Sequence, residues 1–169
     1  MRLRSSDGTQ FELRPVRYQF AGVRGSRCGR DWDANWLVIR GDVQLADRRS
    51  WSFEDPCLTT WEARELAAWL RGVASGAVQP TPFEGGGEER TWMFTEPNLA
   101  LSLAARDDVT ATVRVHLSLE ARPPWLAGDD PGEDPGELFE FFVEVTAPLN
   151  VVAQAADDWT AELATFPER

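Results

Sequence analysis

The chain has 169 residues, 43% of them hydrophobic and 27% charged. This composition excludes wholesale disorder and predicts a single domain, residues 1–169, with a core of its own. The net charge is −11, and residues 96–169 carry all of it, with 15 acidic residues against 4 arginines. So acidic a surface argues against direct binding of nucleic acid or of membranes.

Alternating apolar and polar residues predict strands in the first part of the chain. We expect a first hairpin between Phe11 and Phe20, in which Pro15 marks a sheet edge, a kink or the break between two strands. A charged, aromatic turn over residues 31–35 then leads directly into a strand that ends near Leu45. A further short strand is expected to begin at Trp51.

A helix is predicted over residues 59–72 from its start signal and its spacing. Thr59 and Glu62 form a capping box, and Leu58 can pack on Ala63 as a hydrophobic staple. Five apolar residues follow at helical spacing on one face: Ala63, Leu66, Ala67, Leu70 and Val73. Gly72 and Gly76 are expected to end this helix.

The second half of the chain reads as a meander of strands closed by a helix. Strict alternation covers residues 99–103 and 109–119, and a last strand is expected over residues 138–145. Pro148 begins an amphipathic helix over residues 148–165. The fold predicted is therefore α+β, a mostly antiparallel sheet of about seven strands packed by two amphipathic helices. Residues 74–90 and 121–137, rich in Gly and Pro, are predicted to be flexible loops.

Catalytic machinery is not evident in the residue pattern. The one histidine, His116, lies within a predicted strand and is expected to be partly exposed and not catalytic. Cys28 and Cys57 are too few and too far apart for a zinc site, and the acidic run near residue 130 lacks the calcium-loop spacing. We predict no cofactor and no metal. Convergence of carboxylates into a hydrolytic site stays open for three residues: Glu96, Glu140 and Glu144.

The chain shows no apolar leader segment and no apolar run of membrane-spanning length. A cytoplasmic location is therefore expected, and with it reduced cysteine thiols.

Four segments in this order carry a family resemblance: DWDANWL, CLTTWEARELAAWL, FTEPNLAL and the terminal TFPER. The chain resembles the WapI-type immunity proteins and related small bacterial proteins of unknown function. The resemblance implies a cytoplasmic antidote that binds and silences the toxic C-terminal domain of a secreted or contact-delivered toxin, often a nuclease. It supplies no catalytic residues.

The expected contact surface for such a toxin is acidic, because nuclease toxins bind phosphate and are basic. It comprises a possible aromatic anchor and five nearby carboxylates: Trp125, Asp129, Asp130, Glu133, Asp134 and Glu137. Six motif positions are interpreted instead as structural, in turns that fix where strands begin: Asp31, Asp33, Asn35, Trp36, Glu96 and Asn98.

Two other functions remain open from the residues. One is a small-molecule-binding or hydrolytic domain with a pocket between sheet and helices, under the loop at Gly85. The other is a nucleic-acid mimic that regulates a DNA-binding protein, which the acidic charge would also suit.

Overall fold

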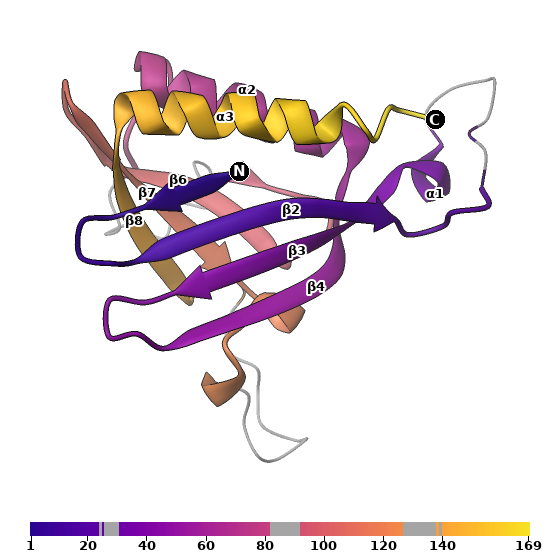
Figure 1. Cartoon of the computed structure of the whole chain (residues 1–169), viewed down its shortest axis with the longest axis horizontal. Helices are drawn as coiled ribbons and strands as arrows, with labels where there is room; N and C mark the ends of the chain where they lie inside the picture. Colours follow the sequence, from indigo (N-terminus) through magenta and orange to yellow (C-terminus); the bar gives the residue numbers. More distant parts are fainter. Residues whose placement is uncertain (24, 26–30, 82–91, 127–137, 139) are drawn as a thin grey trace.

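The computed structural model describes residues 1–23, 25, 31–81, 92–126, 138 and 140–169. In these residues the chain forms eight strands in two antiparallel sheets, together with three α-helices (Figure 1). The predicted α+β class is confirmed, although the strands are divided between two sheets where a single sheet of about seven was expected.

The first sheet, sheet A, has the order β1-β2-β3-β4: β1 (Arg2–Arg4), β2 (Gln10–Tyr18), β3 (Trp36–Gln44) and β4 (Ser50–Thr59). The second sheet, sheet B, has the order β5-β6-β7-β8: β5 (Trp92–Met93), β6 (Leu99–Arg106), β7 (Thr110–Leu117) and β8 (Phe142–Pro148). The helices are α1 (Trp32–Asn35), α2 (Thr60–Ser75) and α3 (Leu149–Leu163). Two short 3₁₀ turns, η2 (Leu119–Ala121) and η3 (Pro124–Leu126), follow β7.

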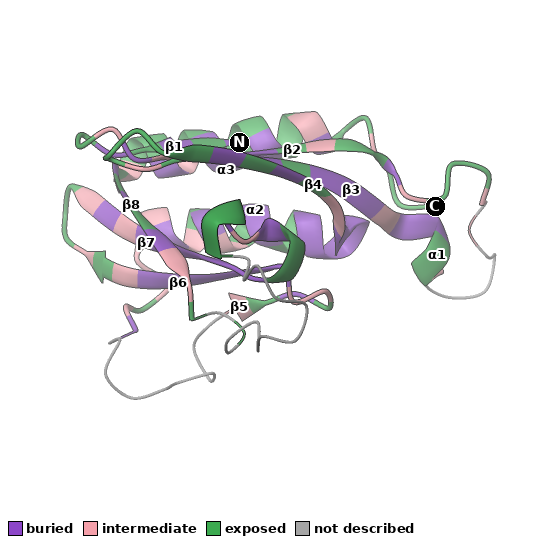
Figure 2. Cartoon of the chain, turned by 90° about the horizontal axis from the view of Figure 1, so that it is seen from below, coloured by how far each residue is buried: buried purple, intermediate pink, exposed green. Residues whose placement is uncertain are grey.

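The two sheets form two layers (Figure 2), and α2 and α3 lie side by side along one edge of them (Figure 1). One apolar cluster fills the space that these elements enclose, because each strand turns its alternate apolar residues inward. Trp159 on α3 is fully buried there, and its indole N–H donates to the carbonyl oxygen of Ala63 on α2 at 2.7 Å. This bond fixes the two helices against each other.

The predicted start of α2 is confirmed. Thr59 is its N-cap, and the reciprocal bonds with Glu62 are both present. The helix ends later than predicted, at Ser75, and Gly72 lies inside it. Gly76 provides the stop, because its φ of 84° is left-handed and glycine adopts that conformation without strain.

Two local expectations, the first hairpin and the start of the last strand, were wrong. β2 runs unbroken past Pro15, with a bulge between Pro15 and Arg17 that absorbs the irregularity, and it pairs with β1 to make the first hairpin. The turn predicted over residues 31–35 takes the form of one helical turn, α1, which the side chain of Asp31 caps. The last strand begins at Phe142, later than the sequence pattern suggested.

The helix over 148–165 is confirmed as α3. Of the two predicted loops, residues 82–91 and 127–137 lie outside the described residues. None of the helices in the described part of the chain has the length and apolar character needed to cross a lipid bilayer.

Candidate partner-binding surface

Trp125 lies in η3 and is held from two sides. Its ring meets the ring of Trp51 edge-on, with 5.2 Å between the centroids, and the Arg49 guanidinium carbon lies 5.0 Å from its centroid. Trp51 is itself buried, and its indole N–H donates to the carbonyl oxygen of Ala121 at 3.0 Å. Trp125 is therefore placed on a rigid base while 38% of its surface stays exposed.

The five carboxylates predicted to join it, at positions 129, 130, 133, 134 and 137, lie outside the described residues. They follow Trp125 within twelve positions of the chain. Their part in a contact surface stays a prediction.

Asn98 lies at the turn between β5 and β6 and is 1% exposed. Its side-chain amide donates to two carboxylates, Asp55 of β4 at 3.0 Å and Glu120 of η2 at 3.2 Å. The backbone N–H of Ser118 donates to the carbonyl oxygen of Asn98 at 2.9 Å. Asn98 thus joins three segments that lie far apart in the sequence.

Burial raises the pKa of Asp55, and the charges of Glu120 and Glu96 raise it further, against the hydrogen bond from Asn98. Burial also raises the pKa of the Cys57 thiol, and the charges of Asp55, Glu120 and Glu96 raise it further. Asp55, Glu96 and Glu120 therefore share one electrostatic environment. Neither Asp55 nor Glu120 was predicted as a site residue, since no local spacing in the sequence relates β4 to η2.

The motif at residues 31–36 organises the start of β3. Asp31 accepts the N–H of Ala34 at 3.2 Å, and the fully buried Asn35 donates to the carbonyl oxygen of Asp31 at 2.8 Å. Asn35 also accepts the hydroxyl of Thr60 at 2.9 Å. Trp36 is half-buried, and Asp33 is exposed in the first turn of α1.

His116 is buried, at 7% exposure, and not partly exposed as predicted. Its Nε2 lies 2.9 Å from the hydroxyl of Ser102, and the ring of Phe142 lies 5.4 Å away, centroid to centroid. Side chains of β6 and β8 therefore flank it on this face of sheet B. Ser102 is also buried, so this Ser–His pair is not presented to solvent.

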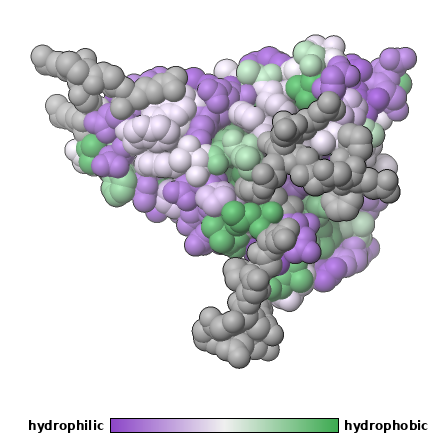
Figure 3. All heavy atoms as spheres, turned by 180° about the vertical axis from the view of Figure 1, so that it is seen from behind, coloured by the Kyte–Doolittle hydropathy of each residue, from purple (hydrophilic) through white to green (hydrophobic). Residues whose placement is uncertain are grey.

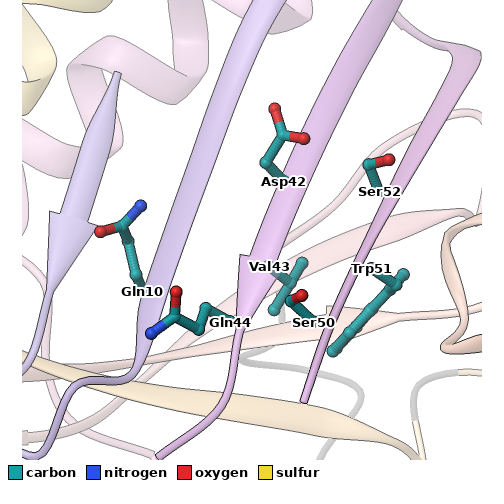
Figure 4. A pocket seen from close by; sticks show the side chains of 7 residues that line it. All are labelled: Gln10, Asp42, Val43, Gln44, Ser50, Trp51 and Ser52. Carbon is teal, nitrogen blue, oxygen red and sulfur yellow. The ribbon is translucent and has the colours of Figure 1, made fainter. Parts of the chain in front are cut away.

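Two open hollows are lined by described residues. A hollow of about 370 Å³ lies on sheet A, where the polar side chains of β2, β3 and β4 spread apart without converging on one point (Figure 4). The other, of about 400 Å³, lies between α2 and α3. In the described part of the chain, no group of three or more His, Cys, Asp or Glu residues is arranged to hold a metal ion.

The sequence matches the model of the Immunity protein WapI-like family over residues 2–167. The matched span begins in β1 and runs past the end of α3, so it includes every element described above. A comparison with curated proteins finds no match. The family model covers nearly the whole chain, and the chain therefore belongs to the WapI-like immunity protein family.

Proposed function

We propose that this protein binds a cognate bacterial toxin domain in the cytoplasm and neutralises it without catalysis. Membership of an immunity protein family is the observation that carries this proposal. An immunity protein acts by occupying its toxin, so a binding surface is what the function requires. The buried position of the Ser102–His116 pair agrees with a role that needs no accessible nucleophile.

The proposed toxin is a nuclease. Its active site has to attract phosphate and is therefore basic, whereas the net charge of this chain is −11. Opposite charges accelerate association and reject wrong partners. We place the contact surface at Trp125 and the five carboxylates between residues 129 and 137, because all of the net negative charge lies in residues 96–169.

The first experiment is co-purification of the tagged protein from its native host. We expect a basic toxin fragment in equal amounts, retained at low salt and lost at high salt. Recovery of the protein alone, together with a small molecule that raises its melting temperature, would contradict the immunity function.

The second experiment tests the acidic surface with two charge-matched variants. One reverses the five carboxylates at positions 129, 130, 133, 134 and 137. The control reverses five exposed carboxylates elsewhere: Asp33, Glu54, Glu65, Asp108 and Asp158. We expect the first variant to associate more slowly with the toxin and to lose most of the salt dependence, and the control to retain both. Equal rates and equal salt dependence in the two variants would show that this acidic surface is not the contact.

A further inference from the structure

η2 packs against β4, which is an edge strand of sheet A, and Trp125 of η3 contacts Trp51 of the same strand. Asn98 connects Glu120 to Asp55 in the middle of that strand, and Ala121 accepts the indole N–H of Trp51 near its beginning. The segment that contains η2 and η3 thus contacts β4 through the side chain of Trp51 and, by way of Asn98, through that of Asp55. We call the resulting surface the β4–η2–η3 surface.

Apolar side chains on this surface point to solvent. Leu119 is 42% exposed, Trp125 38% and Leu126 41%. Figure 3 shows apolar side chains gathered toward the lower end of the rear face, the end at which Figure 1 places this segment. Scattered exposed apolar residues are ordinary, but three within eight positions of one anchored segment form a patch of the kind found at interfaces.

Leu119 adopts a left-handed backbone conformation, with a φ of 50°. This conformation is unfavourable for residues other than glycine. No burial of the Leu119 side chain offsets the cost, because that side chain is exposed. The conformation does place Glu120 beside Asn98 and Asp55. The fold therefore contains a strained residue whose side chain does not contribute to the core.

The charges on the surface are not neutralised within the described residues. The carboxylates of Asp55 and Glu120 both accept a hydrogen bond from the side-chain amide of Asn98. Neither of them, nor Glu96, forms an ion pair with an arginine in the described part of the chain. Burial raises the pKa of Asp55, and the neighbouring charges of Glu120 and Glu96 raise it further. Two adjacent carboxylates that share one neutral donor are electrostatically suited to a cation placed between them.

We propose that the β4–η2–η3 surface binds a segment of the toxin in which an arginine or lysine is flanked by apolar side chains. The cationic group lies between Asp55 and Glu120, and the apolar residues pack on Leu119, Trp125 and Leu126. This inference rests on the proposed function and adds residues outside the acidic run to the contact. An arginine suits the site best, because its planar guanidinium can bond two carboxylates at once.

The binding probe is the C-terminal domain of the toxin whose gene is expected immediately upstream of this one. The variant D55N/E120Q removes both charges and keeps the shapes of the side chains. The variant L119G removes the apolar side chain and suits the left-handed conformation. A matched control, E65Q/D108N, removes two exposed carboxylates elsewhere.

We expect D55N/E120Q to bind about 30-fold more weakly, because the cationic side chain of the toxin would then be buried without a carboxylate partner. L119G should also bind more weakly, while E65Q/D108N should bind like the wild type. Thermal unfolding should show no loss of stability in D55N/E120Q or L119G, which separates a contact role from a folding role.

The outcomes distinguish this inference from the proposed function. If the wild type binds the toxin domain and both variants bind equally well, the inference is wrong and the proposed function stands. If the wild type itself fails to bind the domain, the proposed function is wrong and the inference falls with it.

Discussion

Asn35 and Arg169 are joined by two hydrogen bonds, although 134 positions separate them in the sequence. The side-chain oxygen of Asn35 accepts the backbone N–H of Arg169 at 2.9 Å, and its side-chain nitrogen donates to the backbone carbonyl oxygen at 2.9 Å. The same amide bonds Thr60 and Asp31, so one buried side chain connects α1, the start of α2 and the segment after α3. Asn35 therefore stabilises the packing of these three segments against one another.

Asn35→Ala should lower the free energy of unfolding by about 3 kcal/mol, because it leaves buried backbone and hydroxyl groups without partners. Urea denaturation measures this loss. Asp33→Ala, two positions away and exposed, is the control and should change stability by no more than about 0.5 kcal/mol. An unchanged urea midpoint for Asn35→Ala would contradict the role assigned to it.

Thr59→Ala should cost about 1 kcal/mol, the usual effect of losing an N-cap. Glu62→Ala should cost more, because Glu62 also accepts the backbone N–H of Thr95 at 2.7 Å and so connects α2 to the turn after β5. The double variant should lose less stability than the two single losses added together, since both residues act in one capping box. Strict additivity in thermal unfolding would show that the two bonds act independently.

Asp55→Asn should stabilise the protein at pH 7. The pKa of Asp55 is raised by burial and by Glu120, so the folded state binds its proton more tightly than the unfolded state does. The ionised carboxylate therefore destabilises the fold above the raised pKa, and this cost disappears as the pH falls below the unfolded value. Melting temperatures from pH 3 to pH 8 should converge for variant and wild type at the acidic end.

Asp107→Asn is the control, and it should change the stability at pH 7 in the opposite direction to Asp55→Asn. Backbone N–H groups of Thr110 and Val109 hold the pKa of Asp107 below its usual value. Its ionised form therefore stabilises the fold, and this contribution is lost as the pH falls through the lowered pKa. The variant should be less stable than the wild type at pH 7, and the difference should vanish at low pH. A shift in the same direction for both variants would contradict the pKa assignments.

The thiol of Cys57 should be inert in the folded protein. It is fully buried, and burial together with the carboxylates near it raises its pKa, so the reactive thiolate is scarce. In a Cys28→Ser background, modification by iodoacetamide should proceed only through unfolding and should speed up as urea is added. Rapid modification in native buffer would show that Cys57 is accessible.

The sequence by itself determined the elements that depend on interactions between residues close together in the chain. The bonds between Thr59 and Glu62 span only three positions, so the capping box and the start of α2 could be predicted from neighbouring residues. The alternation through β6 and β7 and the helical spacing of apolar residues likewise predicted the strands, α3 and the α+β class. The resemblance carried by short motifs led to the family in the same way.

Only the tertiary structure decided what depends on distant pairings. The division of the strands into two sheets is one such feature. The bonds from Asn35 to Arg169 span 134 positions, and those that bring Asp55 and Glu120 together at Asn98 span 43 and 22 positions. No periodicity encodes such a pairing, because it arises from how the whole chain closes around its core. The β4–η2–η3 surface is a product of that closure, so neither Asp55 nor Glu120 stood out before the fold was known.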